Sequence, residues 1–160
     1  MATRRQMAAE SEPLDLPMAM EQLLEECRMV LPGIQALFGF QLIAVLSNGF
    51  PRLPDPLKNL HLVATVLNAA AIVLVMSPAA YHRQVSPRAV STRILKVSTR
   101  LLVASMGPLA VSLCVELYLV GFVILRSAWA AAVSAALLAF VAGLWFVLPA
   151  RTRSKGRHNF

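Results

Sequence analysis

The chain has 160 residues, of which 58% are hydrophobic and 14% are charged. Its mean hydropathy of +0.65, together with apolar runs of about twenty residues, excludes an ordinary soluble domain and indicates an integral membrane protein. The formal net charge of +7 does not indicate nucleic-acid binding, because the basic residues lie between the apolar runs, where membrane topology accounts for them. The two cysteines, Cys27 and Cys114, support neither a disulfide framework nor a zinc site.

In chain order, a polar segment comes first: residues 1–15 lack an apolar run and are expected to form a disordered tail. Residues 16–148 are expected to form one all-α, integral membrane four-helix bundle, and residues 149–160 a basic cytoplasmic tail. Each of four apolar segments is long enough to cross about 30 Å of hydrocarbon as a helix. These expected spans are residues 29–50, 57–77, 101–125 and 128–148, with one long connection at 78–100.

Helical extensions into the cytoplasm are expected before the first and third spans. The first begins near Pro17 and is acidic on one face, whereas the second has a basic face. Together with a basic residue that follows the second span, they form a candidate charged network of Glu21, Glu25, Arg28, Arg83, Arg93, Lys96 and Arg100. Each of these residues alone fits a solvated or lipid-headgroup contact, and the sharper hypothesis is that the acidic and basic stripes associate.

Lys and Arg are distributed unequally between the two sides of this topology. With the N-terminus in the cytoplasm, twelve of them lie on the cytoplasmic side and three, Arg52, Lys58 and Arg126, lie outside. Because these residues determine the orientation of membrane helices, both termini are expected in the cytoplasm.

Three short motifs point to a known family: LLEECR at residues 23–28, GIQALFGFQL at 33–42 and PAAYHR at 78–83. In these motifs the chain resembles DUF6328, a family of small four-helix bacterial membrane proteins of unknown function that is common in actinobacteria. The resemblance covers roughly residues 14–125. It implies a location in the bacterial inner (plasma) membrane, and it implies no mechanism.

Glu116 is the most informative single residue, because a charged group near the bilayer centre costs on the order of 2.5–3.5 kcal/mol. A rotation of 100° per residue places Ser105, Ser112 and Glu116 on one face of the third span. Counted from the expected outer ends of their spans, Gln41, Asn68 and Glu116 agree in depth within about one helical turn of ~5.4 Å. These five residues are candidates for a polar transport layer.

Two further polar residues, Asn48 and His61, lie nearer the expected outer surface and are candidates for a water-accessible vestibule. Structural alternatives exist for both groups of candidates. Amides commonly form hydrogen bonds between membrane helices, and a histidine near the interface is typical of a snorkelling side chain. Glu116 is compatible with a titrating group and with a protonated, purely structural one.

These observations lead to two hypotheses about function. The first is an oligomeric channel or small carrier that conducts protons or a monovalent cation, a homo-oligomer being expected because four helices enclose little room. The second is a non-transporting membrane scaffold or regulatory subunit, whose basic cytoplasmic surface binds anionic lipid or a partner protein. No phosphate-binding loop, metal-ligand spacing or catalytic triad occurs in the sequence, so we expect no enzyme activity, cofactor or metal site.

Cysteines introduced at Ser127 and Ser154 test the orientation. We expect a membrane-impermeant thiol reagent to label Ser127→Cys in intact cells and to label Ser154→Cys only after the cells are opened, with the parent chain giving the background. Equal labelling of both variants in intact cells would overturn the topology.

Overall fold

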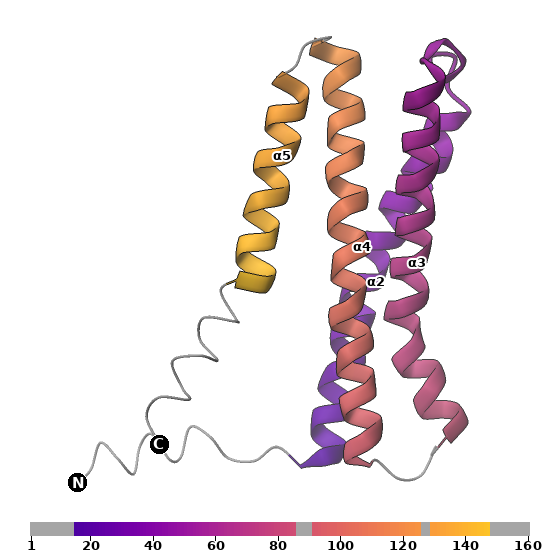
Figure 1. Ribbon diagram of the computed structural model, residues 1–160. Coiled ribbons are helices and arrows are strands. Elements are labelled where there is room, and N and C mark those ends of the chain that lie inside the picture. The colour runs from indigo at the N-terminus through magenta and orange to yellow at the C-terminus, as the bar shows by residue number, and fades with distance from the viewer. Residues whose placement is uncertain (1–14, 86–90, 126–128, 148–160) are drawn as a thin grey trace, which may run out of the picture.

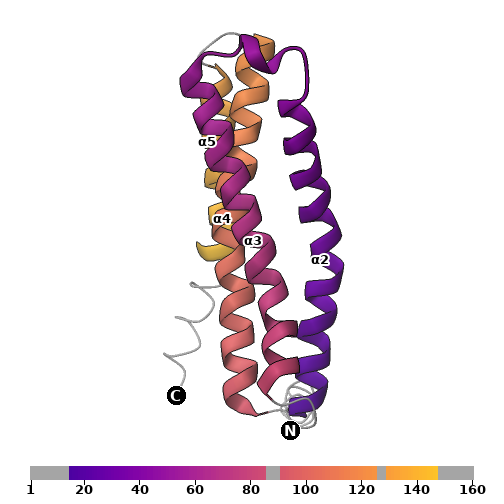
Figure 2. The same ribbon diagram turned by 90° about the vertical axis from the view of Figure 1, so that its right-hand side faces the viewer.

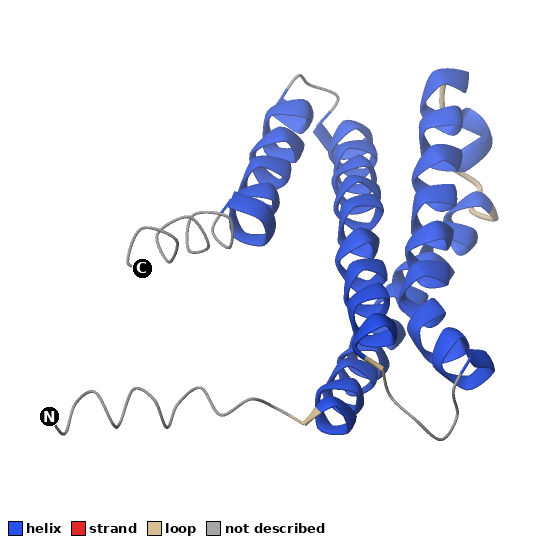
Figure 3. Ribbon diagram, turned by 60° about the horizontal axis from the view of Figure 1, so that its bottom comes forward, coloured by secondary structure: helices blue, strands red, loops and turns tan. Residues whose placement is uncertain are grey.

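The computed structural model describes residues 15–85, 91–125 and 129–147, in which there are helices and no strand (Figure 3). The α-helices are α2 (Leu16–Val45), α3 (Asp55–Val85), α4 (Thr92–Leu125) and α5 (Trp129–Ala142). A short 3-10 helix, η1 (Phe50–Arg52), lies between α2 and α3, and a π-helical turn, η2 (Gly143–Val147), continues α5. The expected all-α architecture is therefore confirmed.

Three of these helices, α2, α3 and α4, are long and apolar enough to cross a membrane. They contain 30, 31 and 34 residues, so at 1.5 Å per residue each is about 45–50 Å long and exceeds the hydrocarbon thickness. The fourth expected span is shorter in the described part of the chain, because its regular α-helix has 14 residues before the π-helical turn begins. The expected tails at residues 1–15 and 149–160 lie outside the described residues, except for Asp15.

The long helices α3 and α4 run antiparallel at the centre of the bundle, with α2 packed on both of them and α5 packed on the other side of α4 (Figures 1 and 2). The start of α2, the end of α3 and the start of α4 lie together at one end of the bundle. The opposite end, which we call the η1 end, contains η1, the start of α3 and the last turn of α4.

Small side chains line the packed faces of α3 and α4. The buried residues of α3 alternate in steps of four and three, as in a heptad seam: Leu57, His61, Ala64, Asn68, Ala71, Val75 and Pro78. Those of α4 include three serines at intervals of seven, Ser98, Ser105 and Ser112. Alanine and serine at such positions allow membrane helices to approach closely.

Two helix boundaries differ from those expected. The helix α2 ends at Val45 rather than near residue 50, because the amides of Leu46 and Ser47 bond three residues back and tighten its last turn. The helix α3 continues through the buried Pro78 to Val85, so the long connection expected at 78–100 is confined to 86–91. Proline is tolerated inside membrane helices, since neighbouring helices and side chains compensate for its missing hydrogen bond.

The contact of α5 with α4 generates a prediction. A Cβ atom at Gly121 of α4 would lie 3.1 Å from the Cβ of Ala130, whereas one at Gly107 of the same helix would meet nothing within 4 Å. We therefore expect Gly121→Leu to destabilise the protein by about 1–3 kcal/mol through overpacking. Thermal unfolding in detergent measures the change, with Gly107→Leu as the matched control. Equal unfolding temperatures for both variants would contradict this account of the packing.

Candidate functional site

Five polar side chains from three helices gather in one hydrogen-bonded group, which we call the polar cluster: Gln41 of α2, His61 and Asn68 of α3, and Ser112 and Glu116 of α4. The first four are 4% exposed or less. The side chain of Glu116 is 17% exposed and is the part of the cluster most open to its surroundings.

Gln41 is the centre of this cluster. Its side-chain Nε2 donates hydrogen bonds to Ser112 Oγ and to Glu116 Oε1, each at 3.1 Å. Its Oε1 accepts a hydrogen bond from Asn68 Nδ2 at 3.0 Å, and its backbone carbonyl lies 3.0 Å from His61 Nε2. Both protons and the oxygen of one amide are therefore used to join α2 to α3 and α4.

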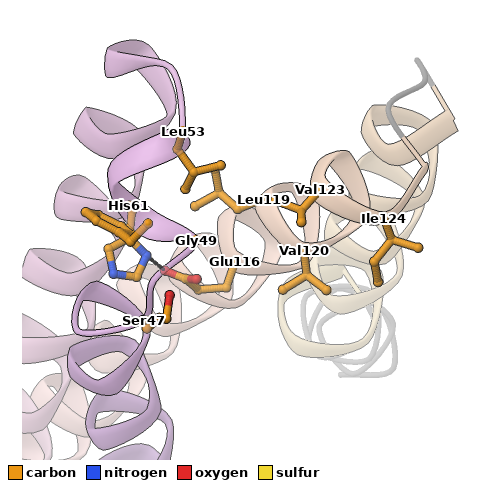
Figure 4. A pocket seen from close by; sticks show the side chains of 11 residues that line it. Ser47, Gly49, Leu53, His61, Glu116, Leu119, Val120, Val123 and Ile124 are labelled. Carbon is orange, nitrogen blue, oxygen red and sulfur yellow. Dashed lines mark ion pairs between the residues drawn. The ribbon is translucent and has the colours of Figure 1, made fainter.

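His61 and Glu116 form the one contact between titratable groups in the polar cluster, with 3.0 Å between His61 Nδ1 and Glu116 Oε1 (Figure 4). Because Nε2 faces the carbonyl oxygen of Gln41, that nitrogen has to be the protonated one. The contact at Nδ1 then requires a single proton shared with Glu116, which makes the pair either imidazolium and carboxylate or imidazole and carboxylic acid. The ring of Phe50 packs edge-on against the imidazole, 5.2 Å between centroids.

A pocket of about 270 Å³ opens beside this pair at the η1 end of the bundle. Its walls come from the end of α2, from η1 and from the last turns of α4, and Figure 4 shows Leu53 on one side and Val120 on the other. Apart from Ser47, the described side chains that line it are apolar except for His61 and Glu116. The titratable pair therefore meets an apolar pocket.

Two of the expected residues lie outside the cluster. Ser105 is buried, but its hydroxyl donates to the Leu102 carbonyl within α4 and so does not reach Gln41. Asn48 is exposed and is not among the described residues that line the pocket, so its place in a vestibule with His61 stays a prediction. The helix α2 ends at Val45, so the helical spacing from Gln41 does not extend to residue 48.

The interpretation of His61 as a snorkelling residue at the interface was wrong, because its side chain is buried among Gln41, Glu116 and Phe50. One signal in the sequence indicated otherwise. His61 and Asn68 are seven residues apart and therefore share a helix face, and Asn68 was already placed in the polar layer. Neither the contact with a backbone carbonyl nor the pocket had a signal of its own in the sequence.

The charged network does not assemble between α2 and α4. Its one recorded ion pair joins Glu25 to Arg28 at 3.2 Å within α2, and in the described ranges no ion pair joins the two helices. Glu21 and Glu25 instead face His82 of α3 across a surface pocket. The basic residues of α4 are exposed, and Lys96 and Arg100 line a groove on their own helix.

Comparison with known proteins gives one result about this chain. The model of a family of unknown function, DUF6328, matches residues 10–149. No curated protein and no solved structure matches the chain.

The central position of Gln41 generates a prediction about stability. Replacing it with Leu removes two donated hydrogen bonds and one accepted bond from buried partners, so we expect Gln41→Leu to lower the free energy of unfolding by about 1–3 kcal/mol. The matched control is Gln35→Leu, because Gln35 is exposed on the same helix. Chemical unfolding in detergent compares the two variants, and equal losses would mean that the cluster contributes nothing to stability.

Proposed function

We propose that this chain, which belongs to the DUF6328 family, is a bacterial inner-membrane protein that moves protons or another monovalent cation, with Glu116 as its central titratable group. The observation that supports this most is the contact of Glu116 with His61 beside an open pocket. An ionisable residue at this depth has a cost that a purely structural role does not require, because a neutral amide makes similar hydrogen bonds.

The atoms around Glu116 favour a proton over a metal cation. Its Oε1 is in contact with two nitrogen atoms, Gln41 Nε2 and His61 Nδ1. A metal cation such as Na⁺ needs several oxygen ligands in place of these N–H groups. A proton needs only the carboxylate and the imidazole, and the geometry lets both groups hold it in turn.

The rest of the bundle supports a carrier or an oligomer rather than an open pore through one chain. On the side of the cluster away from the pocket, α2, α3 and α4 enclose an apolar core that includes Leu23, Cys27, Ile34, Ala71 and Val75. In this conformation the side chain of Glu116 is therefore open toward the pocket and closed off by the core on the other side, and we propose that the pocket serves one side of the membrane. Passage to the other side needs a second arrangement of the helices or an interface between copies, and we propose a homo-oligomer with both termini in the cytoplasm.

The exposed basic side chains of α4 favour the second candidate function. Lys96 and Arg100 lie on one surface groove, and such a surface suits the anionic headgroups of a membrane or an acidic partner protein. A scaffold role would leave the Glu116–His61 contact without a function, so we rank the scaffold role second. Neither proposal includes a catalytic step or a cofactor.

Proton flux into proteoliposomes with an internal pH dye tests the first proposal. We expect Glu116→Gln to lower flux by about 10²-fold or more, the effect typical of removing an essential acid–base group, while the protein still folds. The matched control is Glu26→Gln, since Glu26 is exposed on α2 and outside the polar cluster. Undiminished flux in Glu116→Gln across a pH series would overturn the proposal.

A further inference from the structure

The residues that line the pocket beside Glu116 indicate which class of ligand the pocket can bind. It has about 270 Å³ of space, and its walls include Phe50, Leu53, Leu119 and Val120. Proton exchange at Glu116 needs only a water beside its carboxylate, so the apolar walls of the pocket go beyond what that exchange requires. A small apolar body with one polar group fits it better.

The polar atoms that face the pocket accept hydrogen bonds. Glu116 Oε1 is occupied by Gln41 and His61, whereas Oε2 has no hydrogen bond to the described part of the chain. Both ring nitrogens of His61 are also occupied, by Glu116 and by a backbone carbonyl. The other polar side chain on the pocket is the hydroxyl of Ser47, and among the residues that the structure describes no Lys or Arg lines the pocket. A ligand that complements these groups donates hydrogen bonds and is positively charged.

We propose that this pocket binds a compact lipophilic ammonium ion, whose N–H group donates to Glu116 and whose apolar body lies between η1 and α4. The inference rests on the proposed function, since the ammonium ion and the transported proton compete for one carboxylate. Binding releases the single proton shared by Glu116 and His61 into water, and a second N–H group of the ammonium ion takes the place of that proton at His61 Nδ1. Charge is conserved in this exchange, because one cation enters as one proton leaves.

The mouth of the pocket indicates how such a ligand enters. Val120, Val123 and Ile124 line it and are 52%, 55% and 72% exposed, so a path from the lipid side is apolar. The ammonium group of phosphatidylethanolamine shares the same chemistry. Its phosphate, however, would be placed near Glu116, where none of the described residues that line the pocket is basic and could neutralise it. A free amine is therefore the better occupant.

The test uses three probes with one apolar cage and the full-length protein in detergent. These are 1-aminoadamantane, its trimethylated quaternary analogue and 1-adamantanol, which provide a charged donor, a charge without N–H and a neutral donor. Calorimetry in buffers of different ionisation enthalpy measures both affinity and proton release. We expect saturable binding of the amine with one proton released per ligand, and at least about tenfold weaker binding of the other two probes, equivalent to ~1.4 kcal/mol.

Two variants locate the site, with one control. We expect Glu116→Gln to abolish proton release and Val120→Phe, which fills the pocket and replaces no residue of the polar cluster, to weaken amine binding by at least about tenfold. The control is Val111→Phe, since Val111 is 41% exposed on the same helix and does not line the pocket. Equal affinity for amine and alcohol, or equal effects of the two Phe variants, would overturn the proposal.

Three further outcomes separate the alternatives. Displacement of the amine when nanodiscs contain phosphatidylethanolamine, and not when they contain phosphatidylglycerol alone, would overturn a free ligand in favour of a lipid headgroup. Proton flux that depends on Glu116 without amine binding would overturn this inference and leave the proposed function intact. Amine binding that depends on Glu116 without flux would support the inference and contradict the proposed function.

Discussion

The amide of Gln41 is the interaction on which the arrangement of the three long helices depends. Its donors and acceptor join α2 to Asn68 of α3 and to Ser112 and Glu116 of α4. Apolar helices have little hydrophobic reason to associate in lipid, where side chains are as well solvated by acyl chains as by each other. Hydrogen bonds therefore contribute to which faces meet, and the side-chain amide of Gln41, whose two donors and one acceptor all have partners, defines the register of α2 more sharply than packing alone.

The packing of α3 and α4 is what allows this amide to reach its partners. Alanine and serine on the facing surfaces bring the two backbones close, so Ser112 donates to the carbonyl of Ala64 across the interface at 2.8 Å. The early end of α2 has the opposite effect, since the chain turns away after Val45 and leaves the pocket between η1 and α4. The helices α3 and α4 thus pack closely near Ser112, whereas α2 and α4 separate at the η1 end. His61 and Glu116 lie at the boundary between the closed core and the open pocket.

Much of this arrangement could be predicted from the sequence, and the exceptions have physical causes. Hydropathy and periodicity predicted the helical class, and depth along the spans predicted that Gln41, Asn68 and Glu116 lie at one level. Those estimates depend on where regular helical geometry ends: α2 ends before Asn48, whereas α3 continues through Pro78, where a connection was expected. The burial of His61 depends on a backbone carbonyl from another helix, and no residue type in the sequence encodes such a partner. The orientation and the oligomer remain predictions.

The hydrogen bond from His61 Nε2 to the carbonyl of Gln41 has a consequence for how fast such a protein works. A histidine relays a proton when it receives it on one nitrogen and releases it from the other, but here Nε2 is held by a fixed acceptor. The imidazole thus stores a proton and returns it through the nitrogen that received it. Under the proposed function, a stored proton would cross only when the helices rearrange, so turnover would be limited by conformational exchange on the microsecond to millisecond scale and would level off as the driving gradient increases.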